Sequence, residues 1–451
     1  MQIARDTKTT LHAWDEEQRV IDSKGEPLDA EEAEEFGRIL WDDGLIAAAF
    51  KYSNEHSKTI PASQSLYDFF EERSKDLFTD LSKAEAESKR KTLLQTACMW
   101  GAYVGSPVQR QSLKFFWLEE CIEGENPFVA GTYEKILEAV AKTAREQATI
   151  KLETKVSGIR SGKNTAGEAK PIIETVDGHG WPFDEVVCTM PLGWLKRNQH
   201  AFEPPLEPRL AKAVSNIGYG TLDKVYIIFP EAFWNTPSSS FSHVQSLDPH
   251  GKTPNVTATT QPLHQPSQAQ STPQHYPGFT HWLAPAYAPS NPEGWDQQGA
   301  NLAALPGNTA HPTLLFYIYG PCATHIASLV STTPPETRDA VLIDWFEPYF
   351  SRLANYDASD PRCRPSGILA TAWANDEFAG HGSYSNFQVG LEEGDKDIET
   401  MRHGMPERGV WFAGEHTAPF VALGTSTGAY WAGEGVGQRI AKAYGLHAKT
   451  V

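Results

Sequence analysis

The C-terminal stretch contains residues whose types and spacing suggest ligand binding. GVWFAGE is a short apolar run that ends in the carboxylate of Glu415, and a loop then leads to GTSTGAYWAGEGVGQRIAKAY. This second segment predicts a helix that begins near Thr425 and Ser426 and has small residues on one face. Free N–H groups at a helix start favour an electron-rich ligand, and a carboxylate at a strand end suits the hydroxyls of a ribose or ribityl chain. The alternative is a small-faced helix packed on a sheet, with Glu415 a solvated loop acid.

The same stretch matches the G-x-S-x-G pattern of serine hydrolases at Ser426. That fold needs an acid and then a histidine on later strands. The residues after Ser426 instead predict one helix, with His447 near its end. A serine hydrolase is therefore the least favoured function.

Lys224 lies inside an otherwise apolar predicted strand, LDKVYIIF. An inward-facing lysine loses solvation, which lowers its pKa and favours the neutral amine. Lys224 is therefore a candidate catalytic group. The alternative is a lysine on the solvated face of an edge strand.

Two further segments combine aromatic rings with carboxylates or tight turns. FFWLEECIEGE places Glu119 and Glu120 directly after a run of aromatic residues, and TAWANDEFAGHGSYS places Trp373 and Tyr384 near Gly-rich turns. Aromatic faces together with carboxylates suit an extended polycation. The alternative is a core stripe beside a solvated acidic loop.

Both helices and strands must position these residues. Apolar spacing predicts helices over most of 1–125, and a further helix in TYEKILEAVAKTAREQA, where Tyr133, Ile136, Leu137 and Val140 share one face. Alternation in IKLETKVSGI and apolar runs such as DEVVCTM, LDKVYIIF and LLFYIYG predict strands. The sequence therefore predicts an α/β (α+β) layer architecture rather than a helix bundle.

Composition excludes several classes of protein. The 39 basic and 57 acidic residues give a net charge of −18, so nucleic acid is not an expected partner, whereas a cationic small molecule is compatible. The sequence shows no apolar run long enough to span a membrane. The 5 cysteines lie far apart without metal-ligand spacing, which predicts free thiols, no metal site and a cytoplasmic location, with the peroxisome a less favoured one.

Taken in order, several segments resemble the flavin-containing amine oxidase family, and in particular its polyamine oxidase branch. The principal matching segments are FFWLEECIEGENPFVAGTYEKIL, KLETKV, VVCTMPLGWLK, IGYGTLDKVYIIFPEAFW, FTHWLAP, TAWANDEFAGHGSYSN and VWFAGEHTAPFVALGTSTGAYWAGEG. The resemblance implies a two-domain fold. An FAD-binding layer, truncated at its N-terminus, would comprise 126–200 and 401–451. A mixed-sheet substrate domain would comprise 1–125 and 201–400, with a Ser/Thr/Pro/Gln-rich exposed insertion at 235–277.

The implied reaction is FAD-dependent oxidation of a polyamine such as spermine, spermidine or an acetylated form. Hydride passes from carbon to flavin, and O2 reoxidises the flavin, so that the products are an imine or aldehyde, an amine and H2O2. No G-x-G-x-x-G segment occurs in the sequence, although family members begin with one. The second hypothesis is therefore an amine oxidase-like protein that lacks FAD and is not catalytic.

The resemblance also implies roles for single residues. The positions that match cofactor-contacting residues are Val156, Trp373, Glu415, Thr425 and Ser426. Lys224 matches a lysine that holds a water near the flavin, and Tyr384 matches a position in the substrate cavity. The acidic cluster adds the hypothesis that Glu119 and Glu120 bind the distal charged nitrogens of the substrate.

Overall fold

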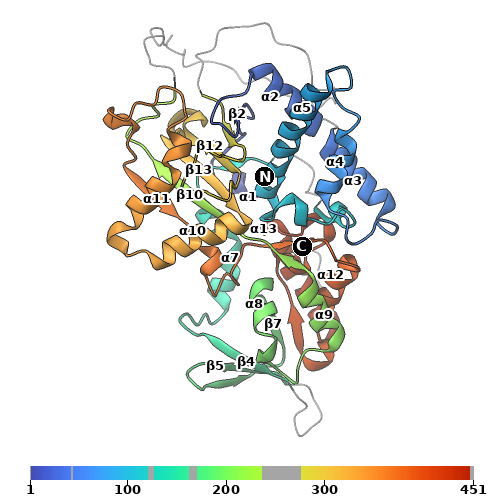
Figure 1. Ribbon diagram of the computed structural model, residues 1–451. Helices are drawn as coiled ribbons and strands as arrows, with labels where there is room; N and C mark the ends of the chain where they lie inside the picture. The colour runs from blue at the N-terminus through green and yellow to red at the C-terminus, as the bar shows by residue number, and fades with distance from the viewer. Residues whose placement is uncertain (1, 42–43, 120–125, 162–169, 236–275, 447–451) are drawn as a thin grey trace, which may run out of the picture.

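The computed structural model describes residues 2–41, 44–119, 126–161, 170–235 and 276–446. Glu120 lies outside the described residues, as does the expected insertion except for residues 235, 276 and 277. Helices and strands are mixed along the chain (Figure 1), as the sequence predicts. None of the helices in the described ranges is both long enough and apolar enough to cross a bilayer.

A six-stranded sheet forms the centre of the upper part of the molecule in Figure 1. Its strands, in spatial order, are β14 (Gly367–Ala370), β10 (Leu222–Ile228), β13 (Thr313–Tyr319), β12 (Gln297–Asn301), β11 (Phe279–Trp282) and β2 (Gln18–Ile21). Every neighbouring pair is antiparallel except β11 and β2, which are parallel. One face packs on α10 (Gly320–Thr332) and α11 (Pro335–Phe350) through a core that includes Val225, Phe316 and Phe346.

The helices expected in the first part of the chain lie to the right of this sheet in Figure 1. They are α2 (Ala30–Leu40), α3 (Leu45–His56), α4 (Leu66–Ser74), α5 (Lys83–Ala97) and the short α6 (Gly101–Val104). Ser65 and Ser82 begin α4 and α5 with complete capping boxes, in which the side chains of Asp68 and Glu85 return the hydrogen bond. The sequence therefore encodes these two helix starts locally.

The lower part of the molecule contains a four-stranded sheet of order β6-β5-β4-β8. Its strands are β4 (Val156–Arg160), β5 (Ile172–Thr175), β6 (Gly180–Pro182) and β8 (Phe202–Glu203). Beside them β7 (Val186–Cys188) pairs in parallel with β16 (Val410–Phe412). The remaining elements here include α8 (Leu192–Arg197), α9 (Pro208–Asn216), α12 (Gly394–His403) and α13 (Ser426–Ala443).

Two details differ from the sequence-based expectations. Residues 150–155 do not form a strand, and β4 begins only at Val156; Ile150 and Leu152 are 58% and 80% exposed, so their alternation has no buried face to satisfy. The predicted helix after residue 132 forms as α7 (Glu134–Gln147), but none of its residues is buried, and Leu137 on its apolar face is 64% exposed. Periodicity identified this helix without identifying what covers it.

Candidate active site

A row of four side chains crosses the six-stranded sheet on the face opposite α10 and α11. Lys224 on β10 pairs with Tyr317 on β13, Tyr317 with Gln298 on β12, and Gln298 with His281 on β11. Residues in register on neighbouring strands point to the same face. The Lys224 Nζ lies 5.5 Å from the centroid of the Tyr317 ring, and burial lowers the pKa of this half-buried lysine. Lys224 therefore faces inward, as the catalytic interpretation of LDKVYIIF requires.

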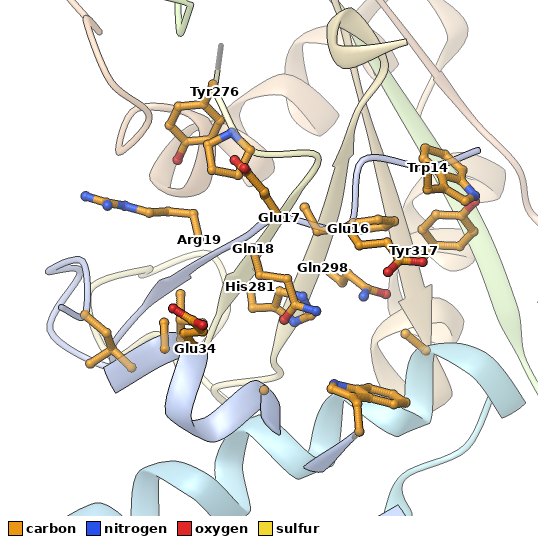
Figure 2. Close-up of a pocket in the computed structure, with 18 of the residues that line it drawn as sticks. Trp14, Glu16, Glu17, Gln18, Arg19, Glu34, Tyr276, His281, Gln298 and Tyr317 are labelled. Carbon is orange, nitrogen blue, oxygen red and sulfur yellow. The ribbon is translucent and has the colours of Figure 1, made fainter. Parts of the chain in front are cut away.

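A cavity of about 1640 Å³ is lined by three residues of this row, Tyr317, Gln298 and His281 (Figure 2). Lys224 is not itself a lining residue, but its cross-strand partner Tyr317 and Leu222 of the same strand are. The charged lining residues are the acids Glu16, Glu17 and Glu34 and the bases Arg19 and Arg38, and the aromatic ones include Trp14, Trp41, Tyr103, Tyr276 and Tyr317. Carboxylates thus outnumber guanidinium groups, and rings supply π faces. Both features favour a cationic ligand over an anionic one.

Asp223, which the sequence reasoning missed, ties Lys224 to Trp373. Its carboxylate is fully buried and accepts hydrogen bonds from the Thr371 Oγ1 at 2.6 Å, the Trp373 N–H at 2.8 Å and the Ala374 N–H at 3.2 Å. The Thr371 Oγ1 in turn accepts a hydrogen bond from the backbone N–H of Lys224 at 2.9 Å. The available signal was the charged residue directly before Lys224, on the opposite face of the same strand.

Glu415 is held beside Tyr384 by backbone and side-chain donors. Its Oε1 accepts the Ser385 N–H at 3.0 Å, and its Oε2 accepts the Ser385 hydroxyl at 2.6 Å and the Gly424 N–H at 3.1 Å. The Tyr384 hydroxyl donates to the carbonyl oxygen of Tyr103, which lines the cavity. Glu415 is therefore linked to the cavity by hydrogen bonds of two adjacent residues: Ser385 bonds to Glu415, and Tyr384 bonds to the lining residue Tyr103.

The start of α13 follows directly. Gly424 has a φ of +69°, a conformation that favours glycine, and the Thr425 side chain caps the helix by accepting the Gly428 N–H at 2.9 Å. Among the described residues, no acceptor is bonded to the N–H groups of Thr425, Ser426 and Thr427. These donors are available to an external acceptor.

This donor set fits a flavin. The free N–H groups at the start of α13 match the carbonyl oxygens and ring nitrogens of an isoalloxazine. Three donors occupy three of the four lone-pair positions of the Glu415 carboxylate, which leaves one for a hydroxyl group of the cofactor. Thr425, Ser426 and Glu415 would thus hold FAD. Val156, the remaining predicted contact in this layer, lies at the start of β4 and packs on the core that also contains Phe412 of β16.

Glu119 is a buried acid outside the cavity lining. It ends a short 3₁₀ helix, Phe116–Glu119, and is not among the residues that line the cavity. Burial raises the pKa of Glu119 to about 8, and the nearby carboxylate of Glu415 contributes to the rise. The structure therefore places Glu119 near Glu415, and the hypothesis that Glu119 binds a distal substrate nitrogen stays a prediction.

Replacing Glu119 by Gln is expected to change how stability depends on pH. Because the pKa of Glu119 rises from 4.5 to about 8 on folding, the native state retains a proton that the unfolded chain loses. The free energy of unfolding of the wild type should therefore fall through this interval, by at most about 1.4 kcal/mol per pH unit. Urea unfolding at pH 5 and pH 8 should show a smaller fall for Glu119→Gln. The same fall in both proteins would contradict this assignment.

Comparison with known proteins agrees with this arrangement. Residues 47–441 match the family model described as flavin containing amine oxidoreductase. The chain is 25% identical over 300 residues to lysine-specific histone demethylase 1 homolog 3 of Oryza sativa subsp. indica, covering 65% of this chain and 28% of that protein. It is also 25% identical over 260 residues to the human peroxisomal N(1)-acetyl-spermine/spermidine oxidase, covering 56% of this chain and 42% of that protein. The matched region thus spans less than half of either relative.

A solved structure gives the same fold. Cyclohexylamine oxidase from Brevibacterium oxydans IH-35A superposes with a TM-score of 0.61 at 15% sequence identity, over 98% of this chain and 85% of that one. The family match covers most of the sequence, and the α13 donors and Glu415 fit a flavin. The chain therefore belongs to the flavin containing amine oxidoreductase family, whose cofactor is FAD.

Proposed function

We propose that this chain oxidises a polyamine with bound FAD and O2. The observation that carries the proposal is an acidic, aromatic-lined cavity whose lining includes Tyr317, the residue that pairs with Lys224 across the sheet. Tyr103 and Tyr384 connect that cavity to Glu415. A cationic chain lying in the cavity would therefore extend toward the groups that fit the cofactor. The human relative is named as an oxidase of acetylated spermine and spermidine, which supports a polyamine as the substrate class.

FAD, when bound, supplies the acceptor for two electrons from the carbon next to the amine nitrogen. The residues of the chain prepare the amine for that step. Oxidation needs a nitrogen lone pair, so the reacting amine must be neutral, and the aromatic walls favour that form by excluding water. Lys224, whose own pKa burial lowers, can hold a water molecule and exchange a proton with it. The carboxylates of the cavity bind the nitrogens that stay charged.

The proposal is tested by giving the purified protein, incubated with FAD, a panel of amines and measuring H2O2. We expect turnover of spermine, spermidine or N(1)-acetylspermine, with little for benzylamine. Turnover restricted to a methyl-lysine peptide would favour demethylation, the activity after which the rice relative is named. Loss of yellow colour on dialysis together with no turnover would favour the FAD-deficient, non-catalytic alternative.

A further inference from the structure

His281 is a buried histidine whose hydrogen-bonding capacity is unused. Its side chain is part of the cavity lining, and the residue is only 3% exposed. Neither Nδ1 nor Nε2 has a hydrogen-bond partner among the described residues. Figure 2 shows His281 among the lining side chains, in the same part of the view as Gln18 and Gln298. A buried polar group without a partner is costly, so this arrangement calls for a ligand.

The imidazole is suited to receive an N–H group. Burial lowers the pKa of His281 to about 4, so near neutral pH the ring is uncharged. An uncharged imidazole has one nitrogen with a free lone pair. The carboxylates of Glu16 and Glu34, which line the same cavity, add the negative charge that a protonated amine requires. The histidine therefore supplies a directional hydrogen-bond acceptor for the amine, and the carboxylates supply the negative charge that attracts it.

The row across the sheet sets the distance from His281 to the proposed catalytic lysine. His281 and Lys224 are separated by three strand-to-strand steps, through Gln298 and Tyr317. Three steps place their Cα atoms about 14 Å apart. A tetraamine that reacts at one inner nitrogen extends two spacers from that nitrogen toward His281. A triamine that reacts at its central nitrogen extends only one spacer, and a diamine is shorter still.

We propose that His281 accepts a hydrogen bond from the terminal nitrogen of a tetraamine whose reacting end lies near Lys224, and so selects substrates by length. This inference rests on the proposed function, because it takes polyamine oxidation as the reaction at the Lys224 end. It adds to that function a specificity residue three strand pairings away from Lys224 in the same row. The intervening Gln298 and Tyr317 side chains form the floor along which the substrate lies.

The test uses His281→Leu and His281→Gln in the full chain, with His200→Leu, an exposed histidine outside the cavity, as the control. His281→Leu removes an unpartnered imidazole and introduces an apolar side chain of similar size, so its melting temperature should not fall below that of the wild type. Its KM for spermine should rise roughly 10- to 100-fold, with kcat unchanged because binding is lost uniformly. The KM for spermidine should stay constant. His281→Gln keeps a neutral acceptor and should restore part of the loss.

Calorimetric titration of spermine into the same proteins gives a readout that is independent of turnover. The dissociation constant of His281→Leu should exceed that of the wild type by a factor similar to the KM change. If the wild type oxidises no amine but binds spermine in a His281-dependent way, the proposed function fails, whereas the binding of a terminal amine by His281 stands. Equal spermine affinity in the wild type and His281→Leu overturns the inference, as does a wild type that binds no spermine or an equal KM rise for spermidine.

Discussion

Replacing Lys224 by Met is expected to lower kcat for spermine by about 100-fold or more, the contribution typical of a positioned proton-transfer group. The protein should nevertheless remain folded. Burial lowers the pKa of Lys224, so the native state disfavours the ammonium form, and the lysine costs stability at every pH at which the unfolded chain is protonated. Methionine carries no such cost. We therefore expect a melting temperature equal to or above that of the wild type, together with slow oxygen consumption.

Lys212→Met is the matched control, because Lys212 lies exposed on α9. Both variants should retain the same amount of FAD, measured by absorbance after the protein is denatured. Similar kcat values for the two variants would show that Lys224 takes no part in the chemistry. A loss of FAD confined to Lys224→Met would instead assign the lysine to cofactor binding.

Replacing Glu415 by Ala is expected to destabilise the protein by about 2–5 kcal/mol and to release FAD. The Ser385 N–H, the Ser385 hydroxyl and the Gly424 N–H all lose their acceptor. The Gly424 donor directly precedes the start of α13, so the loss also loosens the N–H groups that fit the flavin. Urea unfolding of the FAD-free protein measures the first effect, and FAD titration followed by flavin fluorescence measures the second.

Glu434→Ala serves as the comparison, because Glu434 is an exposed acid on the same helix. It should change the free energy of unfolding by about 0.5 kcal/mol or less and leave FAD affinity intact. If both glutamate variants unfold at the same urea concentration and bind FAD equally, Glu415 has neither of the roles assigned to it here.

Local sequence patterns were sufficient for the elements that carry the site. The apolar runs around Lys224 and before Glu415 predicted β10 and β16, and the spacing of small residues after Gly424 predicted α13. These features depend on neighbouring residues only. The family resemblance added FAD and the relation between these segments, which periodicity could not provide.

Long-range contacts account for what the sequence did not reveal. His281 joins Lys224 in one row only because β11, β12, β13 and β10 pair in that order, and strand order is not encoded in any single strand. Asp223 was missed for the same reason, since its partners come from the distant segment that contains Trp373. Glu119 was proposed to bind the substrate because carboxylates follow a run of aromatic residues there, and its proximity to Glu415 is a long-range contact that this local pattern does not contain.

Because of this strand order, the spacing of the residues in the row does not depend on the length of the chain segment that precedes β11. β10 ends at Ile228 and β11 begins at Phe279, yet these consecutive strands are not neighbours in the sheet. Hydrogen bonds to β12 and β2 align β11, and a one-residue slip there would turn His281 to the opposite face. Insertions and deletions between Asn235 and Tyr276, beyond the core residues Phe229, Phe233 and Trp234, can therefore accumulate during evolution without altering the spacing between the two ends of the row.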